Sequence, residues 1–252
     1  MDVCTIFDYT ELDNTALLSQ SPPSILLPIR CLESMAITGT NPSLRIKHSL
    51  SKQHLRAARM FADRGRDLEC RIGSEPGEPE RVEHRAYVAA CILSAVAFLE
   101  SSINEFYLEA VDGGGEALKG LPPPTFALLA QFWLEIEQSA ILHKYQTALL
   151  LGGVEKFERG AGLYQDAESA VKLRNALVHY KPEWDDEQGI HQNLERRLAG
   201  RFPVSPFAST GALWFPHVCL GSGCAHWLVE TVSQFSNEFC SRLKIRSRVP
   251  AA

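Results

Sequence analysis

The segment from Lys172 to Pro182 carries three polar side chains whose types suit phosphodiester chemistry. Arg174 and Asn175 are adjacent, and His179 follows one helical turn later. Histidine titrates near neutrality, so it can give or take a proton at cellular pH. The charged fork of arginine fits phosphate oxygens and the negative charge of the transition state. Asparagine can orient the imidazole or hold a substrate hydroxyl.

The surrounding pattern predicts a helix over residues 163–181 that Pro182 stops. At 100° per residue, four residues form a core stripe on this helix: Ala170, Leu173, Leu177 and Tyr180. Asn175 and His179 point nearly opposite this stripe, and Arg174 lies on its flank. No carboxylate cluster accompanies them, which favours a metal-free route with the ribose 2′-hydroxyl as internal nucleophile. A salt-bridged surface pair of arginine and histidine is the alternative interpretation.

The segment resembles the Arg-x4-6-His signature of the HEPN superfamily, with the polar Asn175 directly after Arg174 as in many members. The order of the predicted helices is similar too. An apolar helix (Ala86–Tyr107) and intervening helices precede the motif, and a long loop and an amphipathic helix follow it. The resemblance covers roughly residues 85–245.

The resemblance implies a helical bundle that dimerises so that two motifs line one composite cleft. It implies a metal-independent endoribonuclease of the toxin–antitoxin, phage-defence or RNA-processing kind, without a cofactor. Arg174 would stabilise the phosphate, His179 would transfer protons and Asn175 would assist. HEPN sites often draw a further polar residue from an earlier helix, for which Glu100 and Asn104 are the candidates. The implied partners are RNA, a second copy of the chain, and a cognate antitoxin or defence partner.

The pattern of the whole chain predicts an all-α fold. Together with the resemblance, it predicts a four- to five-helix HEPN-like bundle with an N-terminal extension and a long loop before the last helix. Residues 1–80 form the extension, with a basic helix near 44–70, and residues 83–246 form the bundle. Helices are expected over 83–111, around 125–151, over 163–181 and over 223–245. The Gly/Pro/Glu-rich stretch 73–80 is interpreted as a linker and residues 183–222 as irregular.

Composition fits a globular protein, with 45% hydrophobic and 22% charged residues. A net charge of −5 disfavours a non-specific nucleic-acid binder without excluding a local basic groove. The seven cysteines are odd in number and scattered, which favours a reducing cytoplasm over a disulfide framework. We expect neither a signal peptide nor a membrane span, because the longest apolar run, Ala86 to Leu99, rises only about 21 Å as helix.

Two other features have open interpretations. The basic stretch 44–67 is either a face for the RNA backbone or a solvated helix face. The segment from His217 to His226 contains Cys219 and Cys224 in an arrangement that zinc would accept, although core packing is the better interpretation of both cysteines. The rival to a nuclease is a non-catalytic HEPN-like module that binds RNA or protein, in which Arg174 and His179 only hold a helix junction or dimer contact.

Overall fold

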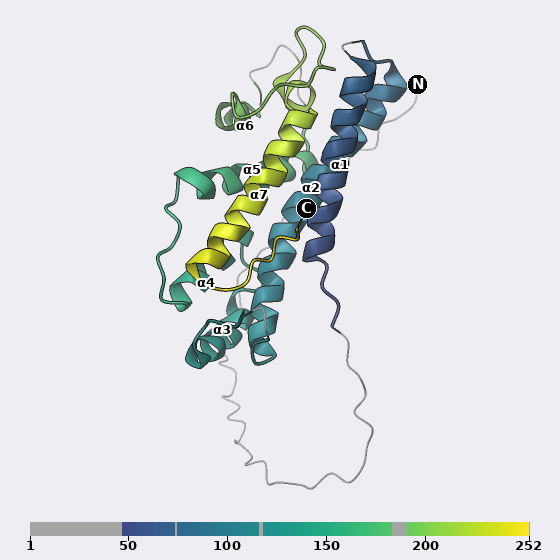
Figure 1. The fold of residues 1–252 in the computed structure, drawn as a ribbon. Helices are drawn as coiled ribbons and strands as arrows, with labels where there is room; N and C mark the ends of the chain where they lie inside the picture. The colour runs from purple at the N-terminus through teal and green to yellow at the C-terminus, as the bar shows by residue number, and fades with distance from the viewer. Residues whose placement is uncertain (1–46, 74, 116–117, 183–188, 190, 252) are drawn as a thin grey trace, which may run out of the picture. The chain divides into compact units, whose positions relative to one another are not determined.

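The computed structural model describes residues 47–251, apart from 74, 116–117, 183–188 and 190. The elements are helices α1 (Ser51–Ile72), α2 (Glu78–Val111), α3 (Pro123–Ile136), α4 (Ile141–Leu151), α5 (Gly162–Val178), α6 (Gln192–Leu198), the short helical turn η2 (Trp214–Val218) and α7 (Ser222–Arg242) (Figure 1). Within the described part there is no strand, only an isolated bridge between Lys119 and Leu121. The predicted all-α class is confirmed.

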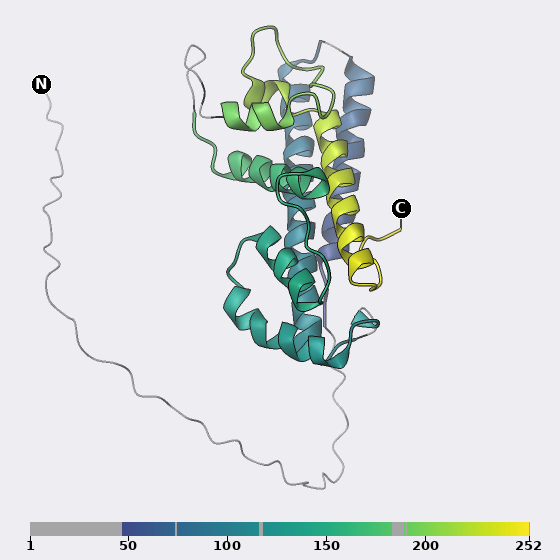
Figure 2. The ribbon, with the colours of Figure 1, turned by 90° about the vertical axis from the view of Figure 1, so that its left-hand side faces the viewer.

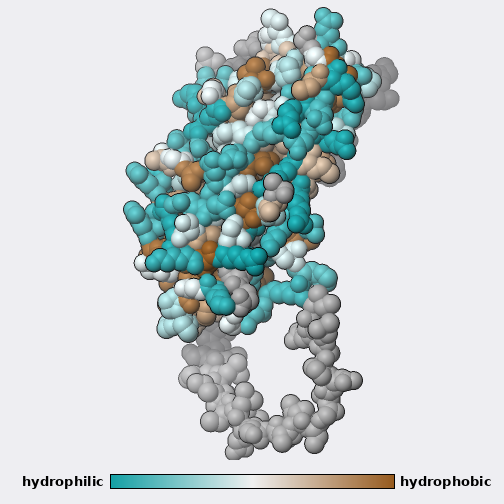
Figure 3. All heavy atoms as spheres, in the orientation of Figure 1, coloured by the Kyte–Doolittle hydropathy of each residue, from teal (hydrophilic) through white to brown (hydrophobic). Residues whose placement is uncertain are grey.

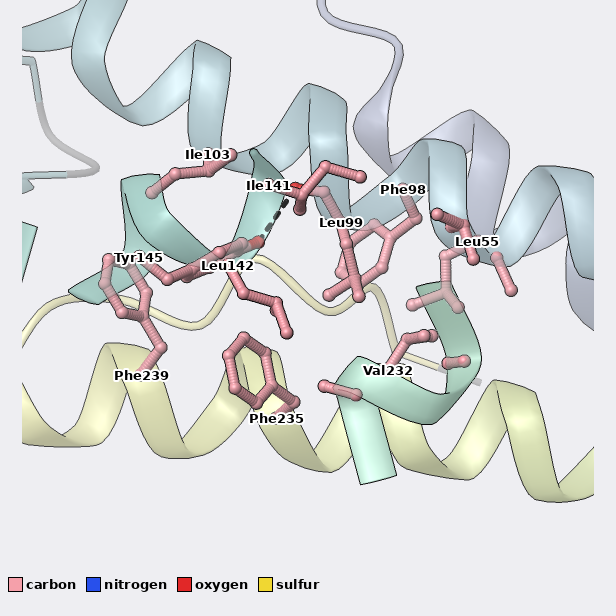
Figure 4. Close-up of a cluster of buried hydrophobic side chains, with 14 of the residues drawn as sticks. Leu55, Phe98, Leu99, Ile103, Ile141, Leu142, Tyr145, Val232, Phe235 and Phe239 are labelled. Carbon is pink, nitrogen blue, oxygen red and sulfur yellow. Dashed lines mark hydrogen bonds between the residues drawn. The ribbon is translucent and has the colours of Figure 1, made fainter. Parts of the chain in front are cut away.

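Helix α2 is the centre of the fold, since α1, α3, α4, α5 and α7 all contact it. In Figures 1 and 2 it runs beside α1 and α7, while α5 crosses it. Figure 4 shows the shared core, where Leu55 of α1, Phe98 of α2 and Phe235 of α7 converge. The buried Tyr145 hydroxyl of α4 donates a hydrogen bond to the Leu99 carbonyl at 2.9 Å. The helix is apolar on most sides because neighbours cover most sides.

The length and composition of α2 alone would allow it to cross a membrane. An 18-residue window within it has a mean hydropathy of 1.8, so the apolar stretch is longer than the sequence analysis expected. Half of that window is buried inside the fold. A buried core helix passes the same test of length and composition, and the packing of α2 against five other helices is what such a helix requires.

Helix α1 packs along α2 and α7 and belongs to the compact unit of residues 47–252. Its buried face consists largely of small and leucine residues at helical spacing: Leu55, Ala58, Ala62, Gly65 and Leu68. The sequence predicts an extension that includes this helix and ends near residue 80. In the structure the helix packs with the bundle, because its apolar face needs α2 and α7 for burial. Residues 1–46 lie outside the described part.

Helix ends differ from the predicted ones for local reasons. α2 begins at Glu78, inside the expected linker, because Pro79 occupies a first-turn position where proline is tolerated. α5 ends at Val178, and His179 is its C-cap. α6 lies within the stretch 183–222, for which the sequence predicts irregular structure. Its two buried leucines, Leu194 and Leu198, are too few to show a helical period in the sequence.

The segment after α7 packs back onto the first two helices. Arg248 is buried and pairs with Glu109 and Glu105 of α2, the latter at 3.7 Å. Arg59 of α1 donates a hydrogen bond to the Pro250 carbonyl at 3.0 Å. These contacts tie the last described residues to α1 and α2. On the face drawn in Figure 3, hydrophobic residues are scattered among hydrophilic ones.

Candidate functional site

The polar segment singled out in the sequence lies at the C-terminal end of α5. Asn175 and His179 are both exposed, and the His179 amide donates a hydrogen bond to the Asn175 carbonyl at 2.9 Å. The expected core stripe holds for Ala170 and Leu173, which are fully buried. It fails at Tyr180, which is 41% exposed because the helix ends before that residue.

Arg174 faces the opposite way, toward α2. Its guanidinium lies 3.6 Å from the Glu100 carboxylate, with the two side chains 25% and 48% exposed. The structure therefore brings the predicted auxiliary residue Glu100 to the predicted phosphate-binding arginine. An ion pair this exposed contributes little to stability, on the order of 0–1 kcal/mol.

Asn104, the second auxiliary candidate, contacts a residue that sequence reasoning missed. Lys144 of α4 is only 3% exposed, and its Nζ donates a hydrogen bond to Asn104 Oδ1 at 2.8 Å. The same Nζ lies 5.4 Å from the centroid of the Trp133 ring. Burial lowers the pKa of Lys144, and the charges of Glu100 and Glu137 oppose this effect. The available signal was the single lysine of a largely apolar helix, but such lysines usually extend their ammonium to solvent.

Arg174 and His179 are not brought together within one chain. They are five positions apart in the sequence, which places them about 140° apart around an ideal helix. In the described part of the chain the His179 side chain has no hydrogen-bond partner, and Arg174 pairs with Glu100 alone. The predicted triplet is thus divided, with Arg174 on the α2 side and Asn175 and His179 exposed.

A groove of about 600 Å³ runs between α5 and α6. Its lining includes three cations and no carboxylate among the described residues; it consists of Lys172, Ala176, His191, Asn193, Leu194, Arg196 and Arg197. Lys172, Ala176 and His179 lie within about 60° of one another around α5. The exposed His179 imidazole therefore stands on the helix face that borders this groove.

Glu168 balances part of the groove's positive charge. Its carboxylate lies 3.2 Å from the Lys172 ammonium and 2.8 Å from the Arg197 guanidinium. Burial raises the pKa of Glu168, but hydrogen bonds and charge from these two cations outweigh burial and leave the pKa below its ordinary value. Arg196 instead donates to the neutral Asn193 amide oxygen, so its charge is available to a ligand.

An aromatic stack joins the end of α5 to the loop before α7. The Tyr180 and His191 rings are nearly parallel, 7° apart in plane with centroids 5.6 Å apart. Phe215 of η2 contacts both rings, at 4.7 Å from His191 and 5.9 Å from Tyr180. This stack fixes the chain immediately after His179. No local pattern predicts this stack, because its three residues come from three separate segments.

The two cysteines of the segment from His217 to His226 pack in the hydrophobic core. Cys219 and Cys224 are fully buried, and burial raises the pKa of both thiols far above their usual range. His217 contacts Arg85, while His226 lies 3.3 Å from Asp63. Across the described residues no group of three or more His, Cys, Asp or Glu side chains is placed to hold a metal ion.

The basic face of α1 is exposed on the side away from α2, including Lys52, Arg56 and Arg64. This placement is compatible with either interpretation offered for it. Comparison with known proteins adds no assignment: no family model, curated protein or solved structure matches the chain.

Proposed function

We propose that the chain is a metal-independent endoribonuclease of the HEPN type that acts as a homodimer, as a toxin or phage-defence effector in the cytoplasm. The observation that carries this proposal is the exposed His179 imidazole at the end of α5, on the face that borders a cationic groove. Lys172, Arg196 and Arg197 supply the charge that an RNA backbone requires there.

The proposed reaction uses the RNA's own 2′-hydroxyl. This oxygen attacks the adjacent phosphorus, the bond to the 5′-oxygen breaks, and a 2′,3′-cyclic phosphate and a 5′-hydroxyl form. His179 takes the proton from the attacking hydroxyl or gives one to the leaving oxygen. Arg174 stabilises the charge on the phosphoryl oxygens, Asn175 positions the ribose, and Glu100 and Asn104 are auxiliary.

A homodimer would bring Arg174 of one chain close to His179 of the other, which the single chain does not do. Arg174 and His179 face different sides of α5, so a second copy would supply the residue that each half-site lacks. The end of α5 offers an apolar contact beside His179, since Val178 is 51% exposed. We therefore place the two α5 ends against each other in the proposed dimer, with an antitoxin or defence partner acting on this assembly.

The decisive experiment is cleavage of single-stranded RNA by the full chain in EDTA. We expect cyclic-phosphate products, no cleavage of RNA carrying 2′-deoxy positions, and a loss on the order of 10²-fold or more in His179→Ala. His143→Ala is the matched control, because this exposed histidine of α4 is outside the motif. Undiminished cleavage by His179→Ala would remove the site assignment.

Mixing two inactive variants tests the composite site. In a mixture of Arg174→Ala and His179→Ala chains, half of the dimers are mixed, and each mixed dimer holds one intact pair. About a quarter of the wild-type activity should then return. If both residues acted within one chain, mixing would restore nothing.

The second candidate is a non-catalytic scaffold that binds RNA or protein. The Arg174–Glu100 ion pair favours it, because this contact already gives the arginine a structural partner. Under this function the purified chain binds RNA without cutting it, and His179→Ala lowers stability instead of activity.

A further inference from the structure

A second cavity, of about 530 Å³, lies between the start of α2 and the loop that leads to α7. We call it the Arg81–Arg85 pocket, after two arginines one helical turn apart on its α2 wall. Its polar lining includes Arg81, Arg85, His84, His217, Ser205 and Glu78. Its size suits a small organic ligand, for which pockets of roughly 300–1,000 Å³ are usual.

Among the described residues, the two guanidiniums bind only neutral acceptors. Arg81 donates to the Phe207 carbonyl, and Arg85 Nη2 donates to His217 Nδ1 at 3.3 Å. Over the residues that the structure describes, neither guanidinium pairs with a carboxylate. An arginine carries five N–H donors, so most of them remain available. This differs from the groove beside α5, where Glu168 already neutralises part of the charge.

The histidines add donors and hold the pocket wall in place. Because His217 Nδ1 accepts a hydrogen bond from Arg85, its Nε2 carries the ring proton and can donate to a ligand. His84 is 2% exposed; its Nε2 lies 2.6 Å from Glu69 Oε1, and its ring packs on Phe207 with centroids 4.6 Å apart.

The wall is also anchored to α7. The Glu69 carboxylate accepts a hydrogen bond from the Ser222 amide at 2.7 Å and a second from the Ser222 hydroxyl. One carboxylate of α1 thus joins the His84 side of the pocket to the first turn of α7. These contacts hold the pocket wall beside the two arginines in place before any ligand arrives, which lowers the entropic cost of binding.

We propose that the Arg81–Arg85 pocket binds the phosphate monoester of a nucleotide-sized ligand. Two guanidinium forks match the oxygens of a dianionic phosphate, and the His217 Nε2–H adds a neutral donor. Glu78 is the one carboxylate among the described lining residues, which leaves the pocket positive and disfavours a cationic ligand. This pocket shares no lining residue with the α5 groove, so the binding proposal can be tested independently of the proposed nuclease activity.

Calorimetric titration of the full chain at low salt tests the proposal. The probes are inorganic phosphate, AMP, adenosine, and one short RNA prepared with a 5′-phosphate and with a 5′-hydroxyl. We expect AMP to bind and adenosine not to bind. If only the 5′-phosphorylated RNA binds, the site still recognises a phosphate monoester, and its source is an RNA end. Binding of none of the phosphorylated probes would overturn the proposal.

Variants locate the binding. Arg85→Ala should weaken AMP binding about tenfold or more, because it removes a charged hydrogen-bond donor. Arg56→Ala is the matched control, an exposed arginine of α1 outside the pocket. If Arg85→Ala fails to fold, His217→Ala is the second variant, with a weakening in the same direction. Equal effects of Arg85→Ala and Arg56→Ala would indicate non-specific attraction and overturn the assignment.

Discussion

The Arg174 guanidinium rests 3.6 Å from the Glu100 carboxylate, across the contact between α5 and α2. This pair connects two residues that the sequence offered separately, one from the motif and one from a helix far upstream. Glu100 uses one acceptor and leaves other guanidinium N–H groups available for phosphate. Under the proposed function, Glu100 would orient the arginine, and its own oxygens would not need to touch the substrate.

Glu100→Ala should reduce RNA cleavage about tenfold, because Arg174 loses its fixed orientation. The free energy of unfolding should change by less than about 1 kcal/mol, since the pair is partly exposed. Cleavage rates and urea denaturation of the same preparation test both parts. Glu135→Ala, an exposed carboxylate of α3, is the control. A change in stability without a change in rate would assign the pair to the scaffold function.

His179→Ala separates the two candidate functions by stability. The side chain is exposed and has no hydrogen-bond partner among the described residues, so its removal should change the unfolding free energy by less than about 0.5 kcal/mol. Denaturation in urea gives this value directly. A loss of 2 kcal/mol or more, on the order expected for a buried contact, would mean that the histidine holds the fold together.

Lys144→Met should leave the unfolding free energy within about 1 kcal/mol of wild type, because removing a buried charge offsets the lost hydrogen bond to Asn104. Lys144→Ala should cost more, about 2 kcal/mol or above, since it also empties the space of the stem. Thermal and urea denaturation of both variants measure the difference. Equal, severe losses in the two variants would show instead that the ammonium itself is required.

Glu69→Gln should make stability less sensitive to acid. Burial alone would raise the pKa of Glu69. The hydrogen bonds from His84 and Ser222 together outweigh burial, so the pKa in the folded state lies below the ordinary 4.5. The stabilisation is complete above that value and disappears as the pH falls through the folded pKa. Denaturation between about pH 5 and 3 should show a steeper loss in wild type than in Glu69→Gln. Glu135→Gln, at an exposed position in α3, should follow wild type.

Arg248→Ala should destabilise the chain by about 3 kcal/mol, because it leaves two carboxylates of α2 partly buried without their partner. Arg246→Ala, two residues earlier and exposed, is the matched control and should change little. Chemical denaturation measures both. Similar stabilities for the two variants would mean that the C-terminal segment contributes no binding energy to α2.

The sequence predicted the helical class, the central apolar helix and the exposure of Asn175 and His179, because each depends on helical periodicity within one segment. It also placed Glu100 and Asn104 on the polar end of α2, and Glu100 does meet Arg174. The Glu100 pairing was accessible only through the resemblance, since nothing local in the two segments indicates that they touch.

Other features depended on contacts between distant segments. The hydrogen bond of His84 with Glu69, that of Lys144 with Asn104 and the stack on Phe215 each join residues that no local pattern relates. The packing of α1 on α2 and α7 was missed for the same reason. The Gly/Pro/Glu-rich stretch 73–80 has the composition of a linker. Its last residues nevertheless begin α2, so only residues 73–77 separate α2 from α1.

The hydrogen bond between Arg59 and the Pro250 carbonyl spans 191 residues of sequence. Helix α1 leaves the ribosome before α7 and the segment after it, which complete its packing, have been made. Until the chain has been synthesised past residue 222, the apolar face of α1 is covered at most by α2. Contacts of such long sequence separation slow folding and prolong the exposure of apolar surface. A nascent chain stalled before residue 222 should accordingly depend on chaperones more than the finished protein does.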